Sequence, residues 1–123
     1  MISQALLLQG NHILMVKQYV QRGDIVWNFP GGGIEENETP EAACIREVNE
    51  ETGYTIEIAE LLYTSSNKFT YVAKIVSGEL FLDTNNKDNQ DILDVAWINI
   101  DEEEKFDSYT TPLLKLICSK HNI

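Results

Sequence analysis

The chain has 123 residues, the size of one ordinary domain, and its apolar content of 43% suits a globular core better than a disordered segment. Its formal net charge is −11, because 20 Asp and Glu residues face only 9 Lys and Arg residues. This charge argues against a nucleic-acid polymer as partner, since phosphate-backbone binders need a basic face. An acidic protein that handles an anionic phosphate substrate would instead need a divalent cation as a bridge.

The cysteines and the N-terminal apolar run indicate the cellular compartment. Cys44 and Cys118 form no Cys-x-x-Cys pair and cannot make a zinc site alone, so we expect free thiols in a reducing compartment. The apolar run at residues 5–8 lacks a basic segment before it and is too short for a signal peptide or a membrane span. We therefore expect one cytoplasmic domain over residues 1–123, with no membrane partner.

The first third of the chain favours strands. Alternating and β-branched residues bounded by turn residues predict three of them, at residues 3–8, 13–18 and 26–29. Gly10 and Asn11 mark the turn between the first two, and Pro30 ends the third. The glycines at 31–33 are expected to form a loop whose backbone can approach a ligand closely.

A helix follows, with signals at both of its ends. Thr39 is a suitable N-cap, Pro40 suits the first helical position, and Gly53 is placed to end the helix. Further strands are expected at residues 55–64, 68–77 and 95–100, with a polar loop at 83–91 and a short final helix at 113–119. Strands with one helix inserted between them and another at the end imply an α/β layer fold.

The helix at 39–52 carries an unusual group of charges. At about 100° per residue, Glu47, Glu50 and Glu51 share the side opposite to Val48 and its apolar neighbours. Such neighbours have Cβ atoms roughly 5–6 Å apart, so their carboxylates repel one another. Arg46 is the only basic residue between positions 34 and 60. The pattern suits a hard divalent cation, and the alternative is an acidic, solvated helix face.

The preceding glycines favour the cation. The loop and the helix together match a family motif, the Nudix box. This box reads G, five residues, E, seven residues, R-E-U-x-E-E-x-G-U, with U a bulky aliphatic residue. The matching positions are Gly32, Glu38, Arg46, Glu47, Val48, Glu50, Glu51 and Gly53, within a box that spans residues 32–54. The segment Trp27-Asn28-Phe29-Pro30-Gly31-Gly32 also resembles the lead-in common in that family. Tyr54 stands where the box has an aliphatic residue, which is a departure at a packing position.

The chain therefore resembles the Nudix hydrolases, and more particularly their MutT-like members. The resemblance implies an α/β/α sandwich with a mixed β-sheet. It implies Mg²⁺, with Mn²⁺ as a substitute, held by Glu47, Glu50, Glu51 and the carbonyl of Gly31. Arg46 would hold a box carboxylate in place. Glu38 would support the metal ligands or their water molecules without binding the cation itself. The alternative is that Glu38 is a solvated carboxylate of the first helical turn.

The implied reaction is hydrolysis of a diphosphate linkage. The cation would lower the pKa of a bound water, and a carboxylate would take its proton. Besides the three box glutamates, Asp91 is a candidate, because some family members place an acid six residues before a Trp, here Trp97. Asp94 is a second candidate, and both could equally be polar residues of the loop at 83–91 and the segment that follows it.

The substrate is less well defined. Phe29, Phe69 and Tyr71 are candidates for stacking on a base, against the alternative that strand aromatics belong to the core. We expect a small nucleotide, in the first place a nucleoside triphosphate or another nucleoside diphosphate derivative. The alternatives are dinucleoside polyphosphates, ADP-ribose, nucleotide sugars, or a non-catalytic nucleotide sensor. Many members of the family dimerise, so a homodimer is an alternative to a monomer.

Overall fold

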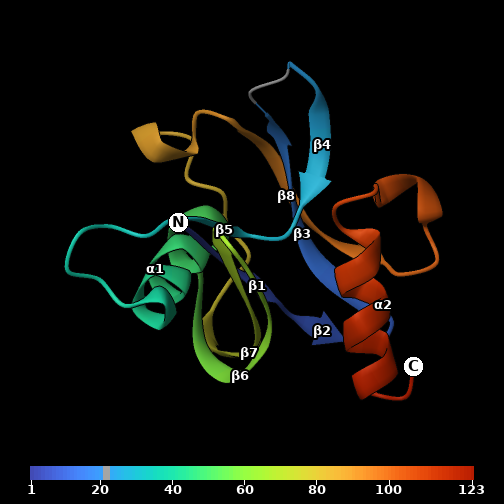
Figure 1. Cartoon of the computed structure of the whole chain (residues 1–123). Helices are drawn as coiled ribbons and strands as arrows, with labels where there is room; N and C mark the ends of the chain where they lie inside the picture. Colours follow the sequence, from blue (N-terminus) through green and yellow to red (C-terminus); the bar gives the residue numbers. More distant parts are fainter. Residues whose placement is uncertain (21–22) are drawn as a thin grey trace.

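In the computed structural model, which describes residues 1–20 and 23–123, strands form a middle layer with one helix on each side (Figure 1). The strands are β1 (Ile2–Leu6), β2 (Leu8–Gln9), β3 (His12–Tyr19), β4 (Ile25–Asn28), β5 (Gly31–Gly33), β6 (Tyr54–Ser65), β7 (Lys68–Gly78) and β8 (Ile92–Asn99). The helices are α1 (Pro40–Thr52) and α2 (Thr111–Lys120), with short 3₁₀ turns η1 (Lys87–Asn89) and η2 (Glu103–Lys105). The α/β expectation is confirmed.

The strands are divided between two sheets. The first is mixed and has the order β5-β1-β7-β6, with β1 and β7 parallel and the other pairs antiparallel. The second is antiparallel, and its central strand β3 pairs with β2, β4 and β8. Only Leu7 separates β1 from β2, so a single stretch of chain joins the two sheets.

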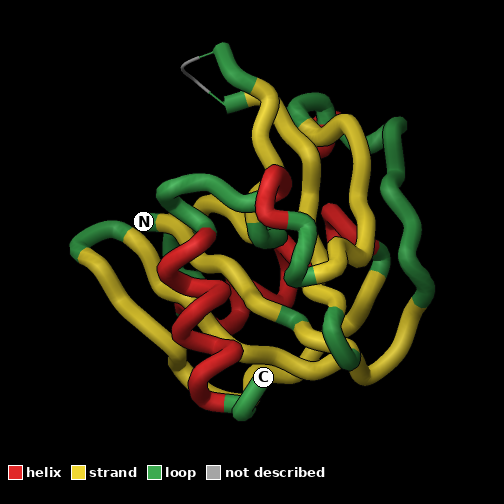
Figure 2. The backbone as a smooth tube through the Cα atoms, turned by 90° about the vertical axis from the view of Figure 1, so that its right-hand side faces the viewer, coloured by secondary structure: helices red, strands yellow, loops and turns green. Residues whose placement is uncertain are grey.

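The side chains of β1 and β3 point alternately to the two helices, and this explains the three layers. Leu6, Ile13 and Met15 belong to the cluster that packs against α2 through Leu114 and Ile117. Successive side chains of a strand point to opposite faces. The neighbouring Ala5, Leu7 and Leu14 accordingly belong to a second cluster, with Cys44 and Val48 of α1. Figure 2, seen from the α2 side, shows α2 lying across the strands.

Helix α1 begins and ends at the residues that the sequence predicted. The Thr39 hydroxyl accepts a hydrogen bond from the Ala42 amide (3.1 Å), and Pro40 is the first helical residue. At the other end, Gly53 has a φ of 84° and donates its amide to the Asn49 carbonyl at 2.9 Å. These caps fix where the helix starts, and therefore which of its residues face β5.

Three predicted boundaries need correction. Residues 31–33 form strand β5 rather than a loop, because they pair antiparallel with residues 2–4 of β1. Helix α2 begins at Thr111 rather than 113, since Pro112 needs no amide partner in the first turn. Strand β8 begins at Ile92 rather than 95, because its pairing with β3 extends to Gln18 across a bulge.

No helix among the described residues is long and apolar enough to cross a membrane.

Candidate functional site

The glycines of β5 meet the acidic side of α1. The Gly31 amide donates a hydrogen bond to Glu51 Oε1 at 2.9 Å. A Cβ at Gly32 would lie 2.5 Å from Oε2 of Glu47, and one at Gly31 would collide with the Ser3 carbonyl and Gln4. Gly31 therefore requires glycine, because backbone atoms block a side chain there, and a side chain at Gly32 would displace the Glu47 carboxylate. The backbone of β5 thus forms one wall beside the carboxylates of the helix.

Arg46 organises these carboxylates. Its Nε and Nη2 donate to the two carboxylate oxygens of Glu38 at 2.7 and 2.9 Å, which is a bidentate pair. Its Nη1 lies 2.9 Å from Glu47 Oε1 and 3.4 Å from Glu50 Oε2, and Nη2 also donates to the Gly33 carbonyl at 3.0 Å. The guanidinium thus links the loop before α1, strand β5 and two turns of the helix. The i, i+4 contact with Glu50 is the longest of these hydrogen bonds.

The carboxylates differ in their tendency to ionise. The hydrogen bonds from Arg46 lower the pKa of Glu38 to about 2. Burial raises the pKa of Glu47 above its usual range, against the opposing effect of Arg46. Glu51 is only 7% exposed, and burial raises its pKa to about 8 although the Gly31 amide favours the charged form. The negative charges of Glu47 and Glu50 add to that rise.

A cavity of about 470 Å³ opens over this group of residues. Its walls include Gly31 to Gly33 of β5, Arg46, Glu47 and Glu51 of α1, and Asp88 and Asp91 of the segment before β8. Glu50 does not line it. Asp88 was not a candidate in the sequence, yet its charge contributes to the raised pKa of Glu47. The only signal for it was its place in the polar loop that also holds Asp91.

Hydrogen bonds from Asn89 connect that loop to helix α1. Its side-chain amide donates to the Glu50 carbonyl at 2.8 Å and to the Asp83 carbonyl at 3.1 Å. The residue is buried, and its Oδ1 has no hydrogen-bond partner among the described residues. Through this side chain, the segment that carries Asp88 and Asp91 is held against the C-terminal end of α1.

The site has the donor chemistry of a hard-cation site, since its ligand candidates are all oxygen atoms. In the part of the chain that the structure describes, however, no three acidic, histidine or cysteine side chains converge as they would around one ion. Glu47 and Glu50 contact Arg46, and Glu51 contacts the Gly31 amide. The Glu47 carboxylate nevertheless occupies the space that a Gly32 side chain would fill, so this oxygen ligand candidate lies directly against β5, as a cation held between β5 and α1 would require.

The two candidate aspartates, Asp91 and Asp94, lie in different places. Asp91 lines the cavity over the box residues and also a larger neighbouring cleft. Asp94 is exposed on β8, and its carboxylate accepts a hydrogen bond from the Val95 amide at 2.9 Å. Asp94 lines neither of these two spaces, so the geometry favours Asp91 over Asp94 as the acid nearest to the site.

Two of the three expected stacking residues, Phe29 and Tyr71, belong to the core. Phe29 is 4% exposed and Tyr71 is 2% exposed, and the Tyr71 hydroxyl donates to Glu41 at 2.9 Å. Phe69 stacks on Tyr71 with ring centroids 6.5 Å apart. Because Phe29 and Tyr71 are buried, the interpretation of these two rings as base-stacking residues is corrected, whereas Phe69 is only partly buried and stays a prediction. Tyr54, the departure from the box, packs edge-on against Trp97.

The larger cleft contains residues that sequence analysis missed. It measures about 1000 Å³ and shares Gln18 and Asp91 with the cavity over the box. Lys68 and Tyr109, which are 41 positions apart in the chain, both line it. Neither belongs to a recognisable motif, and only the folded chain brings them together.

Comparisons with known proteins agree with this arrangement. The chain matches the NUDIX domain family over residues 3–117. Among solved structures, a NUDIX hydrolase from Nitrosomonas europaea is 30% identical, with a TM-score of 0.75. That alignment covers 98% of this chain and 87% of the other.

Curated relatives match over shorter stretches. An RNA pyrophosphohydrolase from Histophilus somni is 44% identical over 59 residues, which are 48% of this chain and 29% of that protein. An ADP-sugar pyrophosphatase from Mus musculus is 49% identical over 49 residues, which are 39% of this chain and 22% of that protein. The matched stretches therefore span less than a third of either relative.

Proposed function

Because the chain belongs to the NUDIX family, we propose that it is a hydrolase that cleaves a diphosphate linkage in a small nucleotide, with the help of a divalent cation. The observation that carries this proposal is the buried Glu51 beside Glu47 and Glu50, with a pKa that burial raises to about 8. Charged carboxylates grouped in this way are unfavourable in the folded protein unless a cation neutralises them.

Glu47, Glu50, Glu51 and the Gly31 carbonyl are the residues that would hold Mg²⁺, or Mn²⁺ in its place. Arg46 contacts two of these carboxylates and Glu38 holds the other side of its guanidinium. Arg46 and Glu38 would therefore orient the ligands without binding the cation themselves. When bound, the cation would neutralise charge on the diphosphate and lower the pKa of an attacking water.

The chain's own residues supply the remaining requirements. Asp91, which lines the cavity, is the favoured acceptor for the proton of the attacking water, with the box glutamates as alternatives. No covalent nucleophile is needed. Cys44 does not offer one, because it is fully buried and burial raises the pKa of its thiol to about 12.

For the substrate, we favour a nucleoside triphosphate or another nucleoside diphosphate derivative. The name of the Mus musculus relative describes action on an ADP-sugar, and that of a Proteus vulgaris relative describes action on 8-oxo-dGTP. Both names indicate a phosphoanhydride within a small nucleotide. Dinucleoside polyphosphates, ADP-ribose and nucleotide sugars remain the alternative substrates. A sensor that binds nucleotides without cleaving them is the alternative function.

The direct test is phosphate and pyrophosphate release from a panel of these nucleotides in millimolar Mg²⁺. We expect turnover by the wild type, and loss of most of it in Glu50→Gln and in Glu51→Gln with the fold retained. Glu57→Gln is the matched control, because Glu57 is an exposed glutamate on β6 that lines neither the cavity nor the cleft. Binding without turnover across the panel would favour the sensor.

A second test needs no substrate. A cation that binds only the folded state at a hundredfold excess over its Kd adds about 2.7 kcal/mol of stability. For a domain of this size the melting temperature should rise on the order of 5–10 °C. Melting curves in chelator, in millimolar Mg²⁺ or Mn²⁺, and in NaCl at matched ionic strength measure this effect. If NaCl raises the melting temperature as much as the divalent cations do, the carboxylates are only a solvated acidic surface.

A further inference from the structure

The cleft of about 1000 Å³ extends the cavity over the box residues. Gln18 and Asp91 line both spaces, so a diphosphate lying where the two spaces meet can reach the box residues with one phosphate and the cleft with the other. The cleft has the size of pockets that hold a whole small ligand. Its walls come from both sheets and from the segment before α2, through Asn28 of β4, Lys68 of β7 and Tyr109.

Lys68 is the only cationic side chain among the described residues that line this cleft. It is half-buried, and among the described residues it forms no ion pair and no side-chain hydrogen bond. Asp91 and Asp107 also line the cleft, and neither carboxylate forms an ion pair with Lys68. Oδ1 of Asp107 accepts hydrogen bonds from the amides of Tyr109 and Thr110 at 2.9 and 3.0 Å instead. Arg46, the cation of the adjoining cavity, is already surrounded by carboxylates. In a chain of net charge −11, Lys68 is therefore an available positive charge in the cleft.

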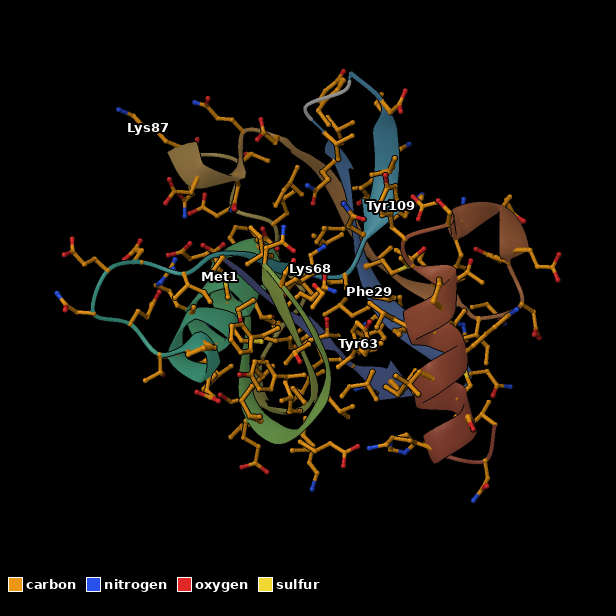
Figure 3. All side chains as sticks on the ribbon, in the orientation of Figure 1. Met1, Phe29, Tyr63, Lys68, Lys87 and Tyr109 are labelled. Carbon is orange, nitrogen blue, oxygen red and sulfur yellow. The ribbon has the colours of Figure 1, made fainter. Side chains whose placement is uncertain are left out.

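The other walls of the cleft suit a nucleoside. Tyr109 is 67% exposed, and an aromatic ring at the wall of a cleft offers a surface on which a base can stack. Asn28 lines the cleft and its side-chain amide forms no hydrogen bond with any described residue. A carboxamide can both donate to and accept from the edge of a base. Figure 3 shows Lys68 near the middle of the molecule, with Tyr109 toward the α2 side.

We infer that Lys68 is a specificity-determining residue, and that it pairs with a phosphate on a nucleoside monophosphate unit held in this cleft with its base against Tyr109. The inference rests on the proposed function and deepens it. When water adds across the diphosphate linkage, each product keeps a phosphate. The product in the cleft would be a nucleoside monophosphate, whose phosphate the Lys68 ammonium contacts as a charge-assisted donor.

Equilibrium binding tests this inference without any turnover. Calorimetric titrations in chelator would use AMP, GMP, CMP and UMP, each compared with its nucleoside, because the phosphate is the only difference within a pair. We expect at least one monophosphate to bind the wild type about tenfold more tightly than its nucleoside, as a charge-assisted hydrogen bond implies. Lys68→Gln should remove that preference, and Lys68→Arg should retain most of it.

Lys74→Gln is the matched control, because Lys74 lies on the same strand, is exposed and does not line the cleft. Lys74→Gln should keep the wild-type preference. Tyr109→Leu should weaken a nucleoside and its monophosphate equally, which separates stacking from charge pairing. The inference is overturned if no monophosphate binds better than its nucleoside, or if Lys68→Gln and Lys74→Gln behave alike. Its failure is distinct from that of the proposed function, which is decided by phosphate release in Mg²⁺.

Discussion

Arg46 holds Glu38 with two hydrogen bonds, from Nε to Oε2 at 2.7 Å and from Nη2 to Oε1 at 2.9 Å, across eight positions of the chain. The same guanidinium contacts Glu47 through Nη1 at 2.9 Å. One planar group therefore joins a loop carboxylate to a carboxylate that we propose as a metal ligand. A point charge could not make this double contact and reach Glu47 in the same geometry.

Arg46→Lys should consequently lower activity while keeping the positive charge. We expect activity or divalent-cation affinity to fall about 10- to 100-fold, as is typical when an outer partner of a metal ligand is lost. Steady-state kinetics at several Mg²⁺ concentrations measure both quantities. Wild-type kinetics in Arg46→Lys would show that the fork geometry has no part in the reaction.

The Glu38–Arg46 pair should also appear in the acid stability of the protein. The folded-state pKa of Glu38 is lowered from 4.5 to about 2, so its stabilising contribution is fully present above pH 4.5. That contribution is lost as the pH falls from 4.5 toward 2. Glu38→Gln should therefore be less stable than the wild type at pH 6, and the difference should shrink toward pH 2. Urea unfolding midpoints at several pH values measure it, and a difference independent of pH would contradict the prediction.

Glu51 should have the opposite pH dependence. Its folded-state pKa is raised from 4.5 to about 8, so between these values the folded protein binds more protons than the unfolded chain. In chelator, the melting temperature should therefore fall as the pH rises from 4.5 through 8. Glu51→Gln should flatten this slope, and so should saturating Mg²⁺ if the cation binds there. An unchanged slope in Glu51→Gln would assign the effect to other groups.

Asp91 and Asp94 form a natural pair for testing the proton acceptor. If Asp91 accepts the proton of the attacking water, Asp91→Asn should lower kcat about 10²–10⁴-fold with a smaller effect on KM. Asp94→Asn makes the same change three positions away on a side chain that lines neither the cavity nor the cleft, and it should retain activity. Near-native rates in both variants would leave the box glutamates as the acceptors.

Replacing Asn89 should lower the free energy of unfolding, although the residue lies in a loop. In Asn89→Asp, an acceptor would face the carbonyls of Glu50 and Asp83 that now accept hydrogen bonds from the side-chain amide. Leaving buried groups unpaired in this way costs about 1–3 kcal/mol. Urea unfolding at pH 7 measures the loss. Asn85→Asp introduces the same charge at an exposed place in the same loop and should change stability by less than about 0.5 kcal/mol. Equal effects of the two substitutions would show that the hydrogen bonds of Asn89 do not stabilise the contact between the loop and α1.

Local signals in the sequence predicted the helix at the centre of the site. Thr39, Pro40 and Gly53 defined the ends of α1, and the box spacing named Glu47 and Glu51, which line the same cavity as β5. The cause is that helix caps and i, i+4 spacing are properties of a short stretch of chain. They need no knowledge of distant residues.

Features that depend on distant partners were not predictable in this way. Residues 31–33 become a strand only because β1 lies beside them. Periodicity could not tell which face of its strand Tyr71 would present, or that this face would lie under α1. Lys68 and Tyr109 come together only when the segment before α2 reaches the start of β7, so no spacing rule could have joined them.

The parallel pairing of β1 with β7 has a consequence for how the protein folds. Residues such as Gln4 and Thr70, whose side chains hydrogen-bond at 3.0 Å, are 66 positions apart. Closing so long a loop has an entropic cost that the adjacent strands β6 and β7 avoid, because a two-residue turn connects them. High contact order slows folding, so the β6–β7 hairpin should form well before β1 enters the sheet. Strand β5 is held in place by its pairing with β1. An intermediate without β1 would therefore contain the glutamates of α1, but the glycines of β5 would not yet lie beside them.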